Sequence, residues 1–306
     1  MVYLLFIVGF VLLFLGGRYL VEGAVSVARD LKVSPLIIGI ILVGFGTSVP
    51  ELITCVRAIL AGSSDIAIGN VVGSNIANVL LVLSIGAIIC TIPIDKKEFK
   101  RDGAALILSS VLLTFVCVAG FVNLYIGAFF VLCLLGYIFV CYKAGAMDDD
   151  DIPLISKSVF IIFAVAILGI AGVVVGANLL IDSSLEIASV LGVSETLIGL
   201  SAVAIGTSLP ELATIIAASL KKHSSLALGN VIGSNIFNTL GVLGVTSFFG
   251  NIEISKSVLR FDIWIMNLAV LAMMIMCMNK WKLTKSKGIA LLVLYIAYIG
   301  AITIRG

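Results

Sequence analysis

The chain has 306 residues, of which 61% are hydrophobic and 12% charged, with a mean hydropathy of +1.26 and a net charge of +2. Soluble domains are nearer half apolar and a quarter charged, so this composition excludes a soluble globular protein and predicts several membrane spans. No basic stripe with interleaved aromatic residues occurs, which argues against nucleic acid and leaves the lipid bilayer as the expected surroundings.

Ten apolar segments are long enough, at about 20 residues each, to cross a bilayer as helices. They fall at residues 2–28, 35–60, 65–91, 103–120, 123–142, 158–185, 195–220, 225–249, 261–279 and 286–304. The first segment lacks the basic start and the small-residue cleavage site of a signal peptide, so we expect it to be retained as a membrane helix.

The most polar stretch, KAGAMDDDDIPLISK, separates these segments into two sets of five. It predicts a first repeat at residues 1–143, an acidic linker at 144–157 and a second repeat at 158–306.

The two halves repeat at an offset of 160 positions. GTSVPEL at 46–52 matches GTSLPEL at 206–212, and GNVVGSNIAN at 69–78 matches GNVIGSNIFN at 229–238. Across 46–78 and 206–238, 19 of 33 positions are identical without a gap, which indicates an internal duplication.

Basic residues concentrate in alternate loops, which predicts the orientation. Fourteen lie in the loops after the first, third, fifth, seventh and ninth segments, and three lie on the opposite side. The first set is therefore expected in the cytoplasm, with both termini outside and the linker inside. Because each half has an odd number of helices, the second enters upside down. The expected fold is an all-α membrane protein with ten transmembrane helices in two inverted five-helix repeats, an arrangement typical of secondary transporters.

Two glutamates, Glu51 and Glu211, occupy equivalent places in the repeats, within apolar segments. An inverted repeat would bring both to similar depth, where an unpaired carboxylate costs several kcal/mol, on the order of 3. Arg57 has Ala217 as its counterpart, so no basic residue is placed to pair with both acids. The simplest partner is a cation that binds and leaves.

Neutral oxygen donors surround these glutamates in the sequence. Pro50 and Pro210 should break their helices and free backbone carbonyls, including those of Gly44 and Ala204. The candidate side-chain donors are Thr47, Ser48, Thr207, Ser208, Ser74, Asn78, Ser234 and Asn238. This donor set contains only hard oxygen, which suits Ca²⁺ or Na⁺ better than zinc or copper; Mg²⁺ is less natural because it demands tight octahedral geometry.

Other readings remain open for several of these residues. The GxxxG glycines favour close helix packing over ligand contact, and Asn70, Asn75, Asn230 and Asn235 favour bonds between helices. The two glutamates could instead form a protonated, neutral pair. Glu22 and Asp182 are matched acids in the first and sixth segments, where a place along the ion pathway and a structural role are equally favoured.

The paired GTSxPEL and GNVxGSNIxN signatures resemble the two alpha repeats of the cation/Ca²⁺ exchanger superfamily, and the resemblance is closest to the sodium/calcium exchangers. It covers the whole chain. The resemblance implies that Ca²⁺ binds centrally between Glu51 and Glu211, and that Na⁺ uses overlapping and flanking sites. It also implies that the first and sixth helices slide across the rest to alternate access.

The resemblance further implies an antiporter that exchanges about three Na⁺ for one Ca²⁺, with net charge movement. Relatives that depend on potassium carry aspartate where this chain has Asn238, so its neutral Asn78 and Asn238 argue against K⁺ co-transport. We expect no permanently bound cofactor, a multi-pass place in the cell membrane, Ca²⁺ and Na⁺ as partners, and a functional monomer.

Three alternatives stand beside this reading. A Ca²⁺/H⁺ antiporter would use the same glutamates with a shared proton in place of Na⁺. A channel is disfavoured because no filter-like loop is visible and symmetric buried sites favour alternating access. An enzyme is disfavoured because the glutamates lack a base–nucleophile pair and no HExxH or GxSxG sequence occurs.

Overall fold

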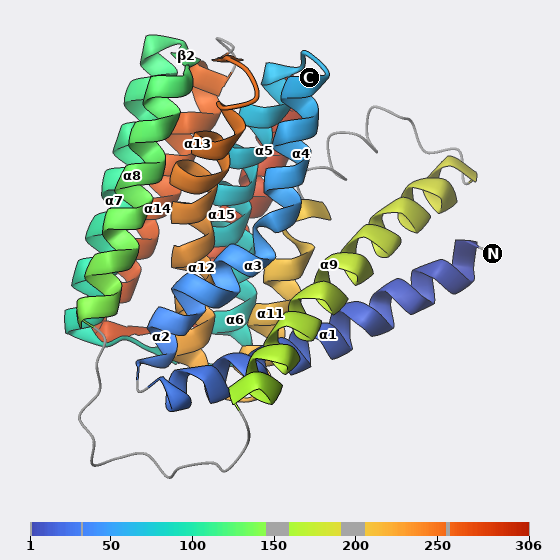
Figure 1. The fold of residues 1–306 in the computed structure, drawn as a ribbon, viewed down its shortest axis with the longest axis vertical. Coiled ribbons are helices and arrows are strands. Elements are labelled where there is room, and N and C mark those ends of the chain that lie inside the picture. The colour runs from blue at the N-terminus through green and yellow to red at the C-terminus, as the bar shows by residue number, and fades with distance from the viewer. Residues whose placement is uncertain (1, 32, 145–158, 191–205, 255–257, 306) are drawn as a thin grey trace.

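The computed structural model describes residues 2–31, 33–144, 159–190, 206–254 and 258–305. Within these ranges the protein is built from helices, with four two-residue strands at the helix ends (Figure 1). The expectation of an all-α membrane fold is therefore confirmed.

The first half contains α1 (Val2–Asp30), α2 (Pro35–Ile38), η1 (Gly39–Gly44), α3 (Phe45–Thr47), α4 (Val49–Leu60), α5 (Ser64–Ala77), η2 (Asn78–Val82), α6 (Leu83–Ile89), α7 (Lys96–Ala119) and α8 (Leu124–Ala144). The second half contains α9 (Val159–Val190), α11 (Leu209–Leu220), α12 (Ser224–Ile236), η4 (Phe237–Val242), α13 (Leu243–Thr246), η5 (Val258–Asp262), α14 (Ile263–Met278), η6 (Asn279–Trp281) and α15 (Lys285–Arg305). Of the η segments, η6 is a 3₁₀-helix and the others are π-helices.

Eight helices in the described residues are long and apolar enough to cross a membrane, and α2 to α4 form a ninth span bent by 40°. The seventh predicted span is described only as α11, because residues 191–205 lie outside the described part. The linker predicted at 144–157 also falls almost wholly outside it, so the domain limits stay a prediction.

Two continuous helices, α5–η2–α6 and α12–η4–α13, form the centre of the bundle, and most residues of the second are buried. The outer helices α7, α8, α14 and α15 surround them and expose large apolar side chains, such as Phe115 and Leu132. Apolar side chains on the outer surface suit contact with lipid, because the spanning part of a membrane protein needs no polar surface.

Helices α1 and α9 cross the bundle obliquely as a pair and diverge from it toward one end (Figure 1). Glycines bring their backbones together. A Cβ atom on Gly16 would lie 2.5 Å from the Val173 nitrogen, and one on Gly169 would lie 2.4 Å from the Leu20 nitrogen. Any larger residue would force the helices apart, so this close packing joins α1 and α9 into one unit.

The described parts of the two repeats share one conformation. Helix α4 and helix α11 begin and end at positions 160 apart, and so do the starts of α5 and α12. The residues between the helices also agree: Ser48 has φ −85° and ψ 4°, and Ser208 has φ −87° and ψ 3°. The backbone bend that precedes each glutamate is thus formed twice, once in each repeat.

Short strands join the repeats at both ends of the bundle. Strand β1 (Ile92–Pro93) pairs antiparallel with β4 (Lys282–Leu283), and β2 (Phe121–Val122) pairs antiparallel with β3 (Ile252–Glu253). Because β1 and β3 occupy equivalent places in the repeats, as do β2 and β4, each pairing joins one repeat to the other.

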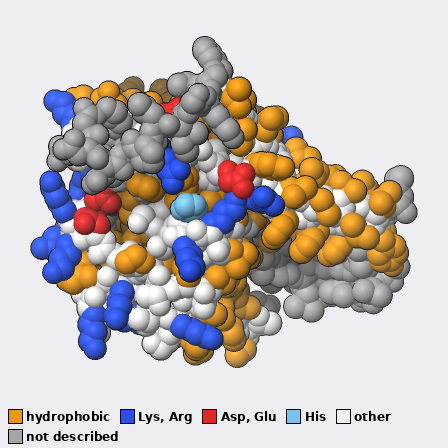
Figure 2. Space-filling model, turned by 90° about the horizontal axis from the view of Figure 1, so that it is seen from below, with side chains coloured by type: hydrophobic (Ala, Val, Ile, Leu, Met, Phe, Trp, Pro, Cys, Tyr) orange, Lys and Arg blue, Asp and Glu red, His pale blue; other side chains and the backbone are white. Residues whose placement is uncertain are grey.

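Basic side chains gather on the end of the bundle that is seen from below in Figure 2. This end carries the starts of α7 and α15, the turn at Lys221 and the strand β4. All six cysteines are free thiols.

Candidate cation site

The second membrane span bends at one residue, Ser48. Pro35 starts α2 behind the capping hydroxyl of Ser34, which accepts a hydrogen bond from the Ile37 amide. The chain then passes through the wide turn of η1 and the short α3 before Ser48 leaves helical geometry. Pro50 occupies the first turn of α4, where its missing N–H costs nothing. The bend that Pro50 predicts is therefore confirmed.

The carbonyls before the bend differ from the expectation of an unwound segment. Residues 44–47 stay helical, and the Ser48 amide donates to the carbonyl oxygens of both Gly44 and Phe45 at 3.2 Å. The Gly44 oxygen also lies 3.4 Å from the Ser234 hydroxyl. Proline lacks only its own N–H, so Pro50 withholds the helical hydrogen bond from the Gly46 carbonyl four residues upstream, whereas the Gly44 and Phe45 carbonyls keep the Ser48 amide. Ala204, the expected equivalent of Gly44, lies outside the described residues.

Glu51 lies in the first turn of α4, in the core of the bundle, with none of its surface exposed. Neither of its carboxylate oxygens accepts a hydrogen bond from the described residues. The helix N-terminus partly stabilises its negative charge, since the unpaired amides of the first turn carry partial positive charge. The hydroxyls of Ser74 and Thr207 lie beside the carboxylate.

Glu211 holds the equivalent place in α11 and is equally buried. One of its oxygens, Oε1, lies 3.3 Å from the Ser234 hydroxyl, and the other has no partner among the described residues. The charge of Glu211 acts on Glu51 across the site, so two like charges lie close together in a medium of low dielectric.

No lysine or arginine in the described chain forms an ion pair with either glutamate. Arg57, in the same helix as Glu51, is exposed on the outside of the bundle. Because two unpaired buried carboxylates are costly, this arrangement fits a bound cation or added protons as the missing partner.

Each repeat places a threonine hydroxyl against the other repeat. Thr47 Oγ1 lies 3.3 Å from Ser234 Oγ, and Thr207 Oγ1 lies 3.2 Å from Ser74 Oγ. All four side chains are buried. The two contacts are equivalent under the repeat, so oxygen atoms from both halves converge on the pair of glutamates.

Asn70 and Asn230 fix these threonines, a role that the sequence did not separate from general helix packing. The Asn70 carbonyl oxygen accepts from Thr207 at 3.2 Å, and the Asn230 oxygen accepts from Thr47 at 3.3 Å. Asn70 also donates to the backbone oxygen of Glu51 at 3.4 Å. The signal available in the sequence was their place in the doubled GN dipeptide.

Four further candidates have buried polar atoms without hydrogen-bond partners among the described residues. They are the hydroxyls of Ser48 and Ser208 and both amide atoms of Asn78 and Asn238. Each asparagine lies in a π-helical segment, η2 or η4, and π-helical turns are frequent at functional sites because they redirect side chains. Unpaired buried polar atoms are rare, so these side chains fit a polar ligand that would supply the missing partners.

Other polar residues of the motif are engaged in packing. Asn75 donates to the Thr239 hydroxyl at 3.0 Å, and Asn235 donates to the Val231 carbonyl at 2.7 Å. A Cβ atom on Gly233 would lie 2.5 Å from the Ile40 carbonyl oxygen. The structural reading is therefore confirmed for Asn75 and Gly233, whereas Asn235 bonds within its own helix and a Cβ atom on Gly69 would meet nothing within 4 Å.

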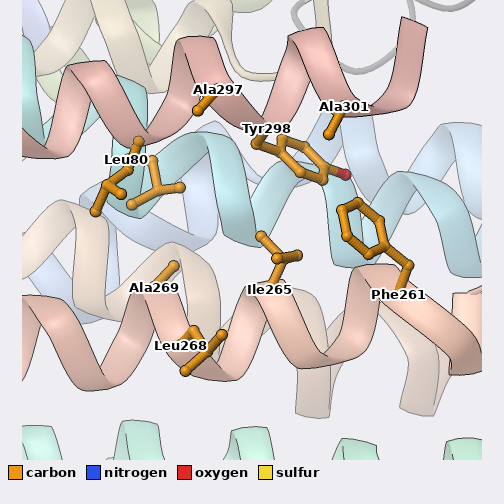
Figure 3. Close-up of a pocket in the computed structure, with 9 residues that line it drawn as sticks. Leu80, Phe261, Ile265, Leu268, Ala269, Ala297, Tyr298 and Ala301 are labelled. Carbon is orange, nitrogen blue, oxygen red and sulfur yellow. The ribbon is translucent and has the colours of Figure 1, made fainter. Parts of the chain in front are cut away.

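A recess between α14 and α15 is a different feature (Figure 3). Its lining includes Leu80, Ile265, Leu268 and Tyr298 and is almost wholly apolar. The Tyr298 hydroxyl donates to Asp262 at 3.1 Å. Apolar walls cannot replace the water of a metal ion, so the recess is unsuited to a cation.

The donor set at the glutamates comprises two carboxylates with neutral hydroxyl and amide oxygens. The described residues contain no group of three or more histidine, cysteine or acidic side chains that could together hold a metal ion. Oxygen ligands of this kind suit Ca²⁺ and Na⁺, as the sequence indicated.

Known proteins share this architecture over nearly the whole chain. The chain is 36% identical to the putative antiporter CaxA of Alkalimonas amylolytica, across 96% of this chain and 95% of that protein. It is 30% identical to the sodium/calcium exchanger MaX1 of Methanosarcina acetivorans, across 97% of each chain.

The fold is similar to that of the sodium-calcium exchanger NCX_Mj soaked with Na⁺ and Sr²⁺. The TM-score is 0.86 at 32% identity, across 98% of this chain and 99% of NCX_Mj. Residues 1–143 and 161–304 match the family of sodium/calcium exchanger proteins, in two blocks that correspond to the two halves. The chain is therefore a multi-pass membrane transporter, rather than an enzyme, and it belongs to the sodium/calcium exchanger protein family.

Proposed function

We propose that this cation antiporter exchanges Na⁺ for Ca²⁺ by alternating access at a central site that contains Glu51 and Glu211. The observation that carries the proposal is the pair of buried carboxylates, which have three unpartnered oxygens and no basic residue beside them. A divalent cation would balance both charges, and so would two monovalent cations.

The proposed ligands of Ca²⁺ are the two glutamates, the hydroxyls of Thr47 and Thr207, and backbone oxygens near Gly44 and Ala204. The proposed Na⁺ positions overlap these and use the hydroxyls of the serines. The neutral amides of Asn78 and Asn238 complete the lining. The set is Ser48, Ser74, Ser208, Ser234, Asn78 and Asn238. Support comes from the unpartnered atoms of this set and from the two-fold equivalence of the donors.

Charge explains why exchange is favoured over leak. The site without a cation holds two unpaired carboxylates. A change from one access state to the other would keep these charges buried, at a cost of several kcal/mol, on the order of 3 or more. A bound Ca²⁺ or Na⁺ removes this cost. Only loaded sites should therefore change state rapidly, which couples the movement of one ion to the return of the other.

The proposed orientation puts the basic end of the bundle in the cytoplasm and both termini outside. Na⁺ gradients across cell membranes point inward, so the expected direction is Ca²⁺ extrusion. The relatives also support Na⁺ and Ca²⁺ as the exchanged cations: MaX1 is a sodium/calcium exchanger by name, and NCX_Mj is described with Na⁺, Ca²⁺ and Sr²⁺.

The test is Ca²⁺ uptake into proteoliposomes of the purified protein that are loaded with Na⁺ and diluted into Na⁺-free buffer. A parallel set carries a pH gradient without Na⁺. Uptake that requires internal Na⁺ supports the proposal. Uptake driven by the pH gradient alone would assign the site to Ca²⁺/H⁺ exchange, and uptake without any counter-ion would contradict coupled exchange.

A further inference from the structure

We propose that the ion pair between Glu22 and Lys221 is a positioning pair that stabilises one of the two transport states over the other. The inference rests on the proposed alternating access, and it concerns how the α1–α9 unit is held rather than how cations are bound.

The α1–α9 unit contacts the rest of the bundle unequally through its two repeat-related halves. Leu20 and Val21 of α1 are completely buried, whereas their mates Leu180 and Ile181 of α9 are only partly buried. Helix α1 is thus docked at Leu20 and Val21, and α9 is less deeply packed at the equivalent Leu180 and Ile181. In an inverted repeat, exchanging these two environments generates the second state.

Glu22 lies in the docked part of α1 and makes two contacts. Its Oε1 atom accepts from Lys221 at the C-terminal end of α11, and it lies 3.2 Å from Nε of Arg18. The Lys221 contact joins the α1–α9 unit to the bundle. The side chains of Lys221 and Glu22 are 29% and 42% exposed, so solvent screens the pair in part.

The repeat provides no equivalent of this pair at the other end. Glu22 corresponds to Asp182, which is exposed, but Lys221 corresponds to Ala61. The two positions have the same backbone conformation, with φ −86° and ψ 1° at Lys221 and φ −86° and ψ 2° at Ala61. When the environments are exchanged, Asp182 therefore approaches an alanine, and the ion pair is lost without replacement.

A histidine, His223, lies in the same turn as Lys221. Its pKa is lowered mainly by burial and further by the positive charges of Arg29 and Lys221. At pH 7.5 this histidine is neutral and adds no charge beside Glu22.

The consequence is an unequal population of two states that the repeat alone would make similar. With the basic end in the cytoplasm, the pair stabilises the state whose cytoplasmic side is packed. Partly exposed ion pairs shift such an equilibrium by about 2- to 5-fold. The apparent affinity for cations is raised on the face that this state opens and lowered on the other.

The test measures backbone hydrogen exchange of the full-length protein in lipid nanodiscs at pH 7.5, without Na⁺ or Ca²⁺. In Glu22→Gln and Lys221→Gln, exchange at residues 20–31 should rise by about 2- to 5-fold, and exchange at 180–190 should fall. The double variant should match Glu22→Gln, because that single variant already removes the contact with Lys221. Lys222→Gln, which removes the adjacent lysine that has no ion pair with a described residue, should match the wild type.

Ala61→Lys separates a positioning role from a merely structural one. It supplies Asp182 with the missing lysine, at the far end of the molecule from Lys221. It should raise exchange at 20–31 and lower it at 180–190, in the same direction as Lys221→Gln. Unchanged exchange at both segments in Ala61→Lys, or equal effects of Lys221→Gln and Lys222→Gln, would overturn the inference.

A second readout is the ratio of the apparent KM values for Ca²⁺ at the two faces of proteoliposomes, which should change by the same 2- to 5-fold. Hydrogen exchange needs no transport. If Na⁺ fails to drive Ca²⁺ uptake in the wild type, the proposed ions are wrong, yet the exchange measurements still decide the role of the pair.

Discussion

The hydroxyl oxygens of Thr47 and Ser234 lie 3.3 Å apart, although 187 positions separate the two residues in the chain. The repeat-related pair, Thr207 and Ser74, is 3.2 Å apart. Each contact thus forms where a segment of one half crosses a helix of the other, and neither half can form the site alone.

Replacing either buried glutamate should abolish exchange. Glu51→Gln and Glu211→Gln each remove one charge that balances Ca²⁺, and losing one partner of a buried charge pair costs about 3–5 kcal/mol. Na⁺-driven Ca²⁺ uptake should fall by more than about 100-fold. The control is Glu253→Gln, an exposed acid on β3. In the absence of cations, Glu51→Gln should not lower the melting temperature, because the variant removes one of two mutually repelling buried charges. Retained Ca²⁺ uptake in this variant would refute the role of the carboxylate.

The Thr47 hydroxyl should contribute to cation affinity independently of its shape. Thr47→Val keeps the volume and removes the oxygen, so the KM for Ca²⁺ should rise by about 3- to 10-fold, equivalent to one neutral hydrogen bond. Thr47→Ser should restore most of the affinity. Thr303→Val, at an exposed hydroxyl of α15, is the matched control. Equal KM values for Thr47→Val and the wild type would remove this residue from the site.

The contact between Gly233 and Ile40 should tolerate no added atom. Gly233→Ala would place Cβ 2.5 Å from the Ile40 carbonyl oxygen, and such overpacking costs about 1–3 kcal/mol. The melting temperature in detergent should fall by several degrees, roughly 2–4 °C per kcal/mol. Gly136→Ala in α8 has nothing within 4 Å and should be neutral or slightly stabilising. Equal melting temperatures for the two variants would show that α12 can shift away from η1.

Exchange of three Na⁺ for one Ca²⁺ should depend on the membrane potential. During Na⁺-driven uptake, three positive charges leave the vesicle for every two that enter, so the interior becomes negative and opposes further exchange. Adding K⁺ on both sides with valinomycin should therefore speed uptake, since 100 mV acts on one charge with about 2.3 kcal/mol. An unchanged rate would indicate a stoichiometry of two Na⁺ for one Ca²⁺.

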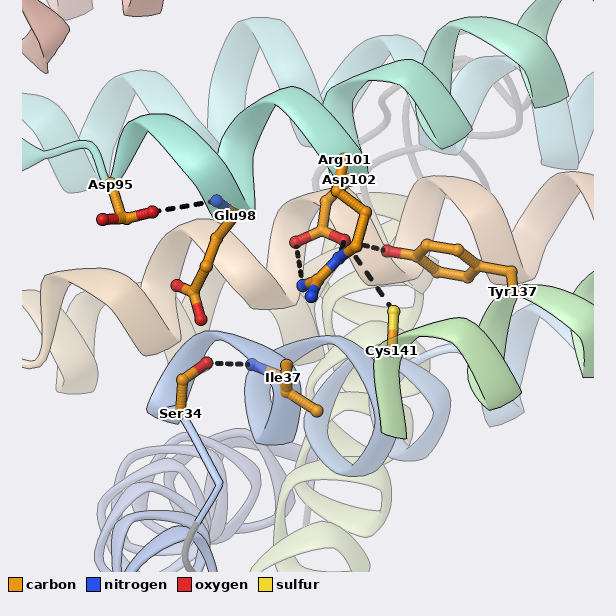
Figure 4. Close-up of polar contacts among 8 residues, drawn as sticks. All are labelled: Ser34, Ile37, Asp95, Glu98, Arg101, Asp102, Tyr137 and Cys141. Atoms are coloured by element: carbon orange, nitrogen blue, oxygen red, sulfur yellow. Dashed lines mark hydrogen bonds and ion pairs between the residues drawn. The ribbon is translucent and has the colours of Figure 1, made fainter. Parts of the chain in front are cut away.

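Asp102 should stabilise the hairpin of α7 and α8 (Figure 4). Its buried carboxylate accepts from Arg101 at 2.6 and 2.8 Å and from the Tyr137 hydroxyl at 3.1 Å. Tyr137→Phe leaves one charged acceptor with one donor fewer, at a cost of about 1.5 kcal/mol. The melting temperature should fall by about 3–6 °C, whereas Tyr125→Phe, at a side chain that is 82% exposed, should leave it unchanged. Equal values would show that Arg101 and the Cys141 thiol satisfy Asp102 without Tyr137.

The sequence determined much of this protein. Apolar segment length predicted the helices within a few residues at most ends, because a bilayer requires about 20 apolar residues for each span. The 160-residue offset predicted the duplication, and the position of Glu51 and Glu211 inside apolar segments predicted their burial without a basic partner. Pro50 predicted the bend, since proline removes a backbone donor wherever it occurs.

Only the tertiary structure decided which atoms meet. The π-helical segments at Asn78 and Asn238 have no signal in the sequence, because their wide turns are set by packing against neighbouring helices. The role of Asn70 depends on Thr207, which arrives from the other repeat. The ion pair of Glu22 with Lys221 joins residues 199 positions apart. Composition and periodicity report how each segment meets lipid or core, whereas contacts between segments depend on how the two inverted halves dock against each other.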